Sequence, residues 1–368
     1  MQRLKMYIYE QKDWPAFTWD LEKIFPHFSE AVYLHGNLIG MMENLSLDAQ
    51  EESDFLIQAN SIISSSAIEG EVLDPLKVRS SIARQRSLPY VENPVIDHHI
   101  DSVVAMSLDA TQHPSQPLTL ERLFSWHRAL FPAGYSGLTP ISTGALRTDR
   151  QGRMQVISRS FGPTPIIHYE APLAIELEQH IQQFLSWINQ EKIERPFFTA
   201  AIAHLWVLTL HPFEDGNGRI GRAIVDYILT RSERTQWRFY SISSQINDEK
   251  QAYYAALERT QKGTLDITEW IIWFVGCLSR SMVSAREIVE QVLRRERFYQ
   301  RAAPYSLTPN QHIVIAKFLD NFEGKLTSSK YAKICKVSQD TATRELKDLC
   351  EKGLFRQEGD GRSTHYVL

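Results

Sequence analysis

The stretch 211–222 places side chains able to accept a proton, bind a metal ion and hold phosphates within twelve positions. Its sequence is His-Pro-Phe-Glu-Asp-Gly-Asn-Gly-Arg-Ile-Gly-Arg. His211 is a candidate proton acceptor, and the Asp215 carboxylate is an oxygen ligand that suits Mg²⁺. Arg219 and Arg222 carry guanidinium groups whose shape matches phosphate. Together they suit transfer of a group from a nucleotide, in which positioning and charge stabilisation dominate catalysis.

Two helices are expected to hold this stretch in place. Residues 195–210 are apolar on most faces, which indicates a buried helix, and Pro212 ends it. Residues 219–229 carry apolar side chains at helical spacing. The turn Gly216–Gly218 therefore leads into a helix N-terminus, where free N–H groups and the helix dipole attract anions. Glycine also lets the backbone approach a phosphate closely.

His204 lies seven residues before His211, on the same face of the first expected helix. A pair of histidines can indicate a metal site, but the sequence offers no third ligand at a suitable spacing. We interpret His204 as a hydrogen-bonded histidine of the core.

The twelve residues resemble the signature of the Fic family, His-Pro-Phe-x-Asp/Glu-Gly-Asn-Gly-Arg-x-x-Arg. Most Fic proteins transfer AMP from ATP to a hydroxyl side chain of a target protein. The resemblance implies a mainly α fold, a helical bundle core with a β-hairpin flap. It implies that His211 is the general base for a Tyr, Ser or Thr hydroxyl and that Asp215 holds Mg²⁺ against the phosphates. Phe213 would anchor the loop, and the implied nucleotide contacts are Gly216, Asn217, Gly218, Arg219, Ile220, Gly221 and Arg222.

A second motif lies upstream, where Ser65-x-x-x-Glu69-Gly70 resembles the inhibitory motif of Fic proteins. Residues 48–66 have the spacing of an amphipathic helix, and Gly70 suits its C-terminal end. The resemblance implies that Glu69 pairs with Arg222 and removes the clamp on the ATP γ-phosphate. Without the Fic motif, an exposed glutamate at a helix end would be the simpler interpretation.

The stretch 153–170 contains two short segments with β-strand character, separated by turn-forming residues. It resembles the Fic flap, a hairpin whose edge would align a target peptide by adding a strand, and an ordinary surface hairpin is the alternative. The resemblance places further nucleotide contacts in the flap and in a later helix. For the aromatic residues of that helix, a role in the core is the alternative. These contacts are Val156, Ile157, Ser158, Tyr253, Tyr254 and Gln261.

Length and composition fit a multidomain globular protein. The 368 residues favour two or three domains. The formal net charge of −4 gives no overall nucleic-acid signal, and three cysteines without a Cys-x-x-Cys spacing predict neither disulfides nor zinc. No leader or membrane span is evident, so we expect a cytoplasmic protein with no membrane partner. We expect an N-terminal module at 1–105, which includes an inhibitory helix at about 48–70, and a catalytic core at 106–282. A helical connector at 283–305 and a winged helix at 306–368 are expected to follow.

The two ends of the chain have their own patterns. Residues 1–40 are rich in aromatic side chains and suggest a short strand pair before helices. Residues 306–368 suggest three helices and a hairpin around Gly359, the order of a winged helix. This segment has ten basic and eight acidic residues, a small surplus for binding phosphates. Binding of DNA through the third helix and binding of a protein or a second copy therefore stay open.

Three functions are compatible with the sequence. The first is a protein adenylyltransferase that uses ATP and Mg²⁺ and is inhibited by Glu69, with an unknown target and self-modification open. The second is a phosphodiesterase that removes AMP from modified proteins, with Glu69 orienting a water. The third is a DNA-binding regulator in which the Fic core senses a nucleotide, although an intact His211 and Asp215 argue against a sensor alone.

Overall fold

The computed structural model describes most of the chain, and two compact units are distinguished in it. The described residues are 7–88, 96–150, 152–158, 165–190, 195–233, 237–319, 322 and 324–368. One unit comprises Met1–Glu43 and Ser53–Ala285, and the other comprises Asn44–Glu52 and Arg286–Leu368. The two units do not divide the chain near residue 105, and the boundary expected there between the N-terminal module and the core stays a prediction.

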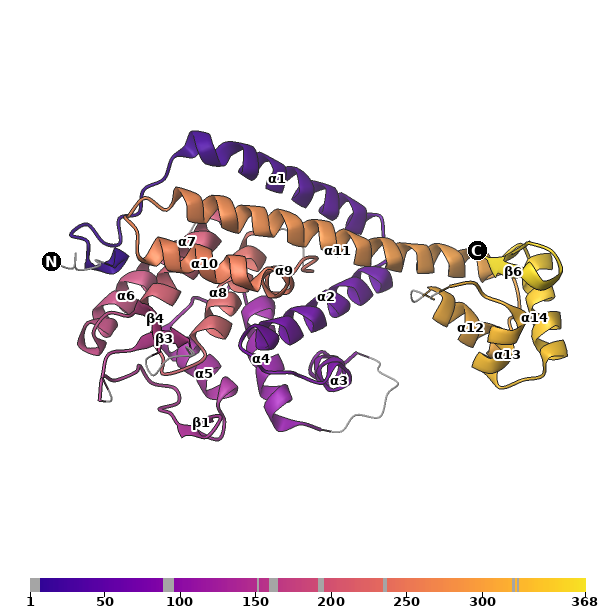
Figure 1. Cartoon of the computed structure of the whole chain (residues 1–368), viewed down its shortest axis with the longest axis horizontal. Coiled ribbons are helices and arrows are strands. Elements are labelled where there is room, and N and C mark those ends of the chain that lie inside the picture. The colour runs from indigo at the N-terminus through magenta and orange to yellow at the C-terminus, as the bar shows by residue number, and fades with distance from the viewer. Residues whose placement is uncertain are drawn as a thin grey trace. The chain divides into compact units, whose positions relative to one another are not determined.

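The first unit is mainly helical (Figure 1). Its helices are α1 (Leu21–Glu43), α2 (Leu47–Ile68), α3 (Pro75–Gln85), α4 (His98–Gln112), α5 (Leu120–Leu130), α6 (Leu177–Ile188), α7 (Pro196–Leu210), α8 (Asn217–Ser232), α9 (Ile242–Asp248), α10 (Lys250–Gln261) and α11 (Thr268–Ala302). The start of α2, up to residue 52, and the end of α11, from residue 286, are assigned to the second unit. Its strands form the hairpins β1 (Tyr135–Ser136) with β2 (Thr139–Pro140) and β3 (Gln155–Ser158) with β4 (Ile166–Glu170). Short 3₁₀ helices span Ile8–Glu10 and Ala174–Glu176. The mainly α fold with a β-hairpin is as the sequence predicts.

The core of this unit is built around α7 and α8, which pack against each other. Nearly every α7 side chain is buried, as expected from its apolar composition, and Pro196 occupies its first turn, where a missing N–H costs nothing. On the outside, α7 packs on α6, and α8 packs on α4 and α5. These contacts fix both sides of the loop between α7 and α8, which carries His211 and Asp215.

From residue 7 onward, where the structure describes it, the N-terminal aromatic stretch does not form the expected strand pair. It contains the 3₁₀ helix and a single parallel bridge from Thr18 to Asp266. Trp14 and Phe17 instead pack edge-on against Trp206 of α7. The gain from burying large rings in the core thus exceeds what an isolated hairpin would offer.

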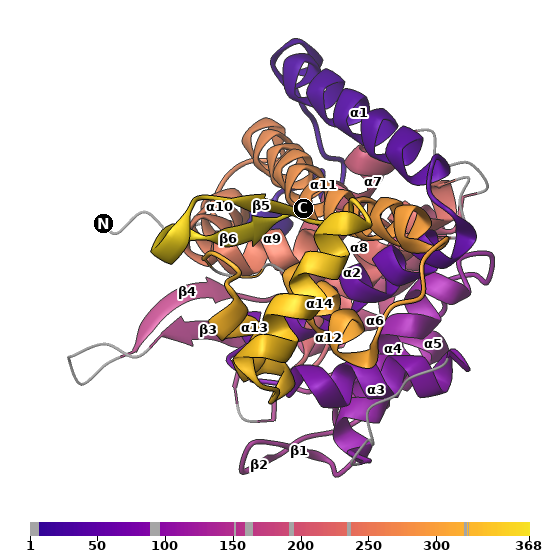
Figure 2. The same cartoon turned by 90° about the vertical axis from the view of Figure 1, so that its right-hand side faces the viewer.

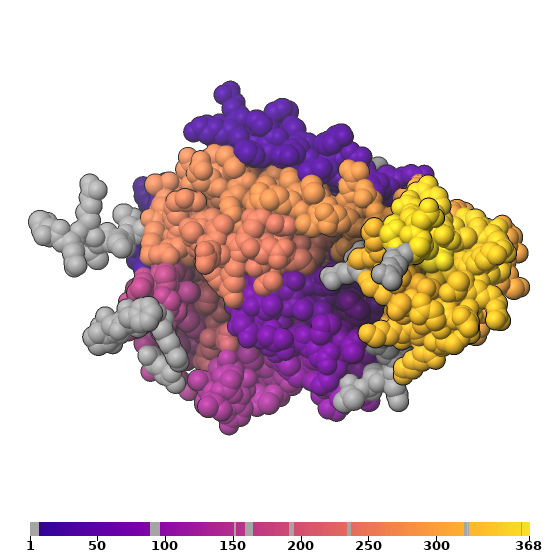
Figure 3. All heavy atoms as spheres, turned by 45° about the vertical axis from the view of Figure 1, so that its right-hand side comes forward, coloured from indigo at the N-terminus to yellow at the C-terminus, as the bar shows by residue number. Residues whose placement is uncertain are grey.

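Helix α11 is continuous over 35 residues, so the connector expected at 283–305 begins inside it rather than at its start. Residues 286–302 of α11 belong to the second unit. In the first unit, the C-terminal part of α2 lies along the face below α9 and α11 (Figure 1), and it contributes to the surface of that face in Figure 3.

The second unit contains three helices and a hairpin in the expected order. These are α12 (Pro309–Leu319), α13 (Ser328–Cys335), α14 (Gln339–Glu351), β5 (Arg356–Glu358) and β6 (His365–Val367). Thr308 and Ser338 cap α12 and α14 through their side chains, and Leu326 adds a bridge to Tyr366 beside the hairpin. A 3₁₀ turn, Gly361–Ser363, lies in the hairpin loop. Assignment to the winged-helix fold stays a prediction.

Among the described residues, no helix has both the length and the apolar character needed to cross a bilayer.

Candidate active site

His211 ends α7 in a left-handed backbone conformation, with φ of +48°. Its Nδ1 lies 3.3 Å from the carbonyl oxygen of Leu208. A carbonyl only accepts hydrogen bonds, so Nδ1 carries the proton and Nε2 keeps a free lone pair. Burial lowers the pKa of His211 below its ordinary value, which favours the neutral ring. The imidazole is therefore prepared to accept a proton at neutral pH.

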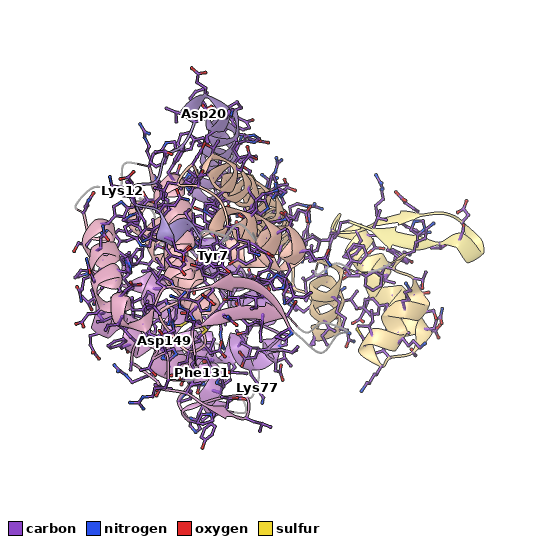
Figure 4. The ribbon with its side chains drawn as sticks, turned by 60° about the vertical axis from the view of Figure 1, so that its left-hand side comes forward. Tyr7, Lys12, Asp20, Lys77, Phe131 and Asp149 are labelled. Atoms are coloured by element: carbon purple, nitrogen blue, oxygen red, sulfur yellow. The ribbon has the colours of Figure 1, made fainter. Side chains whose placement is uncertain are left out.

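Arg147 fixes the backbone of this loop, although sequence reasoning did not single it out. Its side chain is fully buried and forms an ion pair with Asp149 at 2.8 Å. Its Nε donates to the carbonyl of His211 at 2.7 Å, and Nη2 donates to the carbonyl of Pro172. The backbone N–H of Arg147 also donates to Pro212, at 2.9 Å. One guanidinium thus ties the α7–α8 loop to the segment that follows the flap; Asp149 is labelled in Figure 4.

We expect Arg147→Met to destabilise the protein by about 2–4 kcal/mol, because it leaves buried carbonyl groups and Asp149 without their partner. Thermal unfolding followed by circular dichroism measures this loss. Arg286→Met removes an arginine from an exposed ion pair and should change the unfolding temperature little. Equal shifts for the two variants would contradict the structural role of Arg147.

His127 of α5 packs against the α7–α8 loop, and sequence reasoning did not single it out either. Its ring stacks on Phe213 with centroids 4.4 Å apart. Its Nδ1 accepts from the N–H of Gly144 at 2.9 Å, so Nε2 is the donor to the Asp215 carbonyl, 3.2 Å away. Burial lowers the pKa of His127 to about 4, which keeps it neutral. Phe213 is fully buried, as expected for an anchor.

The Asp215 carboxylate is oriented by two donors. Its Oδ1 accepts from the N–H of Gly216 at 2.6 Å, and its Oδ2 is hydrogen-bonded to the hydroxyl of Ser136 in β1. Asp215 lines the cavity beside His211. No cluster of three or more His, Cys, Asp or Glu side chains suited to a metal is found in the described part of the chain. A single carboxylate fits Mg²⁺, which commonly combines one or two carboxylates with substrate phosphates and water.

The turn before α8 depends on its two glycines and on the Asn217 side chain. Gly216 has φ of +80°, and a Cβ there would lie 2.8 Å from the Phe131 ring. A Cβ on Gly218 would lie 2.1 Å from Oε1 of Glu69. The Asn217 amide accepts from the Phe213 N–H at 2.9 Å and donates to the Phe213 carbonyl at 2.8 Å. The Asn217 side chain therefore closes the turn, and only backbone N–H groups there are available to an anion.

Arg222 makes the contact expected from the upstream motif. Its Nη2 lies 2.9 Å from Oε1 of Glu69. Its Nε donates to the Ser65 hydroxyl at 3.0 Å, and Nη2 also donates to the Ser65 carbonyl at 2.8 Å. Helix α2 ends at Ile68, slightly later than expected, and Gly70 follows with φ of +84°. Glu69 thus pairs with Arg222, and Gly70 follows the end of the helix, as the motif predicted.

Five of the expected nucleotide contacts do not line the described cavity: Gly216, Arg219, Ile220, Gly221 and Arg222. Arg219 pairs with Glu71 at 2.9 Å and does not line the cavity. Ile220 is fully buried, and Gly221 packs against His204. Because α8 turns Ile220 and Gly221 into the core, these two positions support the helix in this conformation, and their role as nucleotide contacts stays a prediction.

A cavity of about 970 Å³ joins the loop, the flap and α10. Its wall contains Glu69, His211, Asp215 and Gly218, together with Val156, Ile157, Ser158, Tyr253, Tyr254 and Gln261. The expected nucleotide contacts in the flap and in α10 therefore line the same cavity as His211. Its volume is at the upper end of the range for small-molecule sites.

The walls of the cavity are held by further hydrogen bonds. Tyr253 is buried, and its hydroxyl lies 2.9 Å from Nε2 of His204. Burial lowers the pKa of His204 to about 3, so this residue is a neutral core histidine, as predicted. The Gln261 side chain donates to the Leu208 carbonyl at 3.1 Å, the same carbonyl that orients His211.

The flap is an antiparallel hairpin of β3 and β4, with an irregularity in register between Val156 and Ile157. The two strands lie side by side and extend away from the helices (Figure 2). Ile157 and Ile166 are 55% and 51% exposed, so part of the hairpin presents apolar side chains outward. Of the flap expected at 153–170, positions 159–164 lie outside the described residues.

The loop geometry and its sequence agree with comparison to known families. Residues 117–229 match the model of the Fic/DOC family. This stretch is a Fic domain. The matched stretch contains α5 to α7 and most of α8, and hence the parts of both helices that hold the His211 loop. Residues 7–88, which include α2, match a domain of unknown function, DUF4172.

Relatives of the chain carry the same family name. The curated "Protein adenylyltransferase Fic" of Nematostella vectensis is 23% identical over 227 residues, which cover 60% of this chain and 47% of that protein. The protein of the same name from Drosophila grimshawi is 25% identical over 228 residues, 60% of this chain and 41% of that protein. The matched part thus spans less than half the length of these relatives.

Solved structures share the fold. A Fic family protein from Desulfovibrio desulfuricans has a TM-score of 0.54 at 20% identity, covering 93% of this chain and 96% of that chain. A Fic domain containing signaling protein from Bacteroides thetaiotaomicron has a TM-score of 0.51 at 20% identity, covering 73% and 97%. At this identity the likeness concerns the fold of the Fic domain and its surrounding helices.

Proposed function

We propose that this chain is a protein adenylyltransferase that moves AMP from ATP to a hydroxyl side chain of a protein. The observation that carries the proposal is one cavity that holds His211, Asp215 and the N-terminus of α8. A neutral imidazole with a free Nε2, a carboxylate and the N–H groups of a helix N-terminus are the parts that attack on a phosphate requires. The names of the curated relatives agree with this activity.

In the proposed reaction, Nε2 of His211 takes the proton of the target hydroxyl, and the hydroxyl oxygen attacks the α-phosphorus. The bond from this phosphorus to the bridging oxygen breaks, and pyrophosphate leaves. N–H groups at Gly216–Gly218 stabilise the charge on the phosphates. Asp215 is the residue that would hold Mg²⁺, which when bound neutralises phosphate charge.

Inhibition follows from the contacts of Arg222. Glu69 and Ser65 occupy Nε and Nη2 of this guanidinium, and Nη1 is buried with no hydrogen-bond partner among the described residues. In this position the Arg222 side chain is held by α2 instead of a terminal phosphate. The approach of Glu69 to Gly218 also places a carboxylate at the helix N-terminus, where it opposes an incoming anion. We propose that ATP reaches its reactive position only when Glu69 moves away.

The flap is the proposed docking surface for the target. An exposed hairpin edge can pair with an extended segment of another chain, and the outward isoleucines Ile157 and Ile166 offer apolar contacts beside it. This arrangement would bring a Ser, Thr or Tyr hydroxyl of the bound segment to the cavity that contains His211.

Two labels of ATP test the proposed reaction. A lysate or purified candidate target is incubated with the chain and ATP labelled on either the α- or the γ-phosphate. Transfer of AMP labels the protein with the α-label alone, because the γ-phosphate leaves in pyrophosphate. Protein labelled from the γ-position would contradict the proposal and indicate phosphorylation.

The pH dependence of transfer should reflect the lowered pKa of His211. The neutral imidazole is the active form, so the rate should stay constant from about pH 7 upward and fall only below the ordinary histidine pKa of about 6.5. A rate profile of Glu69→Gly from about pH 5 to about pH 8, the range in which histidine changes its charge, measures this. An acidic limb centred above the ordinary value would contradict the assignment.

Removal of AMP is the second candidate function, favoured by the Glu69 carboxylate that lines the cavity near His211. There it could orient a water to attack an AMP–protein bond. Incubation of the parent chain with an AMP-modified protein separates the two reactions. If the parent chain releases AMP and Glu69→Gly does not, hydrolysis is favoured as the function of the state in which Glu69 pairs with Arg222.

The second unit leaves room for a DNA-binding role. Gln339, Thr343, Arg344 and Lys347 are exposed on α14, on the helix expected to read a groove. If it binds DNA, the affinity of the full chain should fall steeply with salt, and Arg344→Ala should weaken it. If the parent and Arg344→Ala bind DNA with equal affinity, DNA reading by α14 is contradicted and binding of a protein is favoured.

A further inference from the structure

Beside the Glu69–Arg222 pair lies a second charged cluster that the proposed mechanism has not used. Oε2 of Glu71 accepts from Nη1 of Arg219 at 2.9 Å. Oε1 of Glu71 is hydrogen-bonded to Nε2 of His99, the second residue of α4. The hydrogen bond with His99 lowers the pKa of Glu71 and raises the pKa of His99. Glu71 is therefore charged at neutral pH and bridges two helices.

Arg219 is held away from the cavity by this contact. Its side chain is 8% exposed, and its guanidinium lies over the ring of Phe131, 5.0 Å from the centroid; Phe131 is labelled in Figure 4. Its Nε has no hydrogen-bond partner among the described residues. An arginine at the start of α8, three positions from Arg222, is thus paired with a carboxylate instead of facing the space where phosphates would lie.

The two carboxylates come from one short segment at the end of α2. Gly70 separates them, with φ of +84°, and the N–H of Glu71 donates back to the Ser66 carbonyl at 3.0 Å. This turn directs Glu69 to Arg222 and Glu71 to Arg219, which lie one helical turn apart on α8. Movement of the segment away from α8 would therefore break both ion pairs.

We propose that Glu71 is a second inhibitory carboxylate, which withholds Arg219 and fastens the end of α2 to α4 and α8. This inference rests on the proposed function. The contacts of Glu71 exist only while the segment is docked, so they stabilise the inhibited state and reduce the population of the active one. Release of the segment frees both arginines of the Fic motif together.

Glu71→Gln in the full chain tests the proposal, because it removes the charge and keeps the size of the side chain. Transfer from α-labelled ATP should rise roughly two- to fivefold, the range expected when a partly exposed ion pair is lost from one of two states. Hydrogen exchange of the amides at 66–72 should become faster, while the unfolding temperature stays close to that of the parent. A residue with a merely structural role would lower that temperature without raising the rate.

Two further variants sharpen the comparison. His99→Gln leaves the Glu71–Arg219 pair in place and loosens only the attachment to α4, so its increase should be smaller. Glu178→Gln makes the same charge change at an exposed position of α6 and should leave the rate unchanged.

The outcomes separate this inference from the function on which it depends. If Glu69→Gly transfers AMP faster than the parent but Glu71→Gln does not, the second inhibitory contact is refuted and the proposed function stands. If Glu71→Gln is slower than the parent, Glu71 supports Arg219 rather than withholding it, and the inference is also overturned. If no variant, Glu69→Gly included, labels any protein, the proposed function itself fails.

Discussion

Replacing Glu69 by glycine is expected to raise AMP transfer and self-labelling at least about tenfold. The substitution removes the carboxylate that pairs with Arg222 at 2.9 Å, and it clears the approach to the N-terminus of α8. A contact worth about 1.4 kcal/mol in the inhibited state corresponds to a factor of ten. The initial rate of labelling with α-labelled ATP, measured for both chains at equal concentration, gives the ratio.

The increase must come from the cavity and not from general loosening of the fold. Glu69→Gly combined with His211→Ala should therefore be inactive, and Glu178→Gln should behave like the parent. An unchanged rate in Glu69→Gly, with nucleotide binding intact, would refute inhibition by Glu69 while leaving the catalytic assignment open.

Removal of the His211 imidazole is expected to abolish transfer. Loss of a general base costs about 10²–10⁴ in rate, so His211→Ala in the Glu69→Gly background should fall to the lower limit of detection. Nucleotide affinity should change little, because the Nε2 lone pair acts on the target hydroxyl. Transfer rate and ATP affinity measured on the same preparation separate these two effects.

The backbone at His211 calls for a matched control. With φ of +48°, this position suits asparagine better than most residues, because asparagine tolerates the left-handed conformation. His211→Asn should therefore keep the loop and the unfolding temperature, and still be inactive. An active His211→Asn would show that His211 is not the base.

Much of the site was predictable because its chemistry is local. The stretch 211–222 carries its own helix break, turn and helix start, and the structure keeps His211, Asp215 and Gly218 together at the cavity. The pairing of Glu69 with Arg222 spans 153 positions, and only resemblance to a family motif predicted it. The flap hairpin followed from alternation and turn residues.

Other features had no signal in the sequence. Arg147 acts on carbonyl groups of the His211 loop, and contacts to backbone leave no pattern of residue types. Arg219 was expected at the phosphates, but its position depends on Glu71, whose place follows from how α2 ends. The strand pair near Trp14 was wrong because the local β propensity of aromatic residues lost to burial against α7.

The central claim is that phosphates bind over the Gly216–Gly218 turn, opposite His211. A crystal structure of Glu69→Gly with a non-hydrolysable ATP analogue and Mg²⁺ tests it most directly. We predict triphosphate density at the N-terminus of α8, with the α-phosphorus facing Nε2 of His211 and the metal at Asp215. A nucleotide bound elsewhere, with this turn empty or the His211 ring directed away from it, would contradict the account.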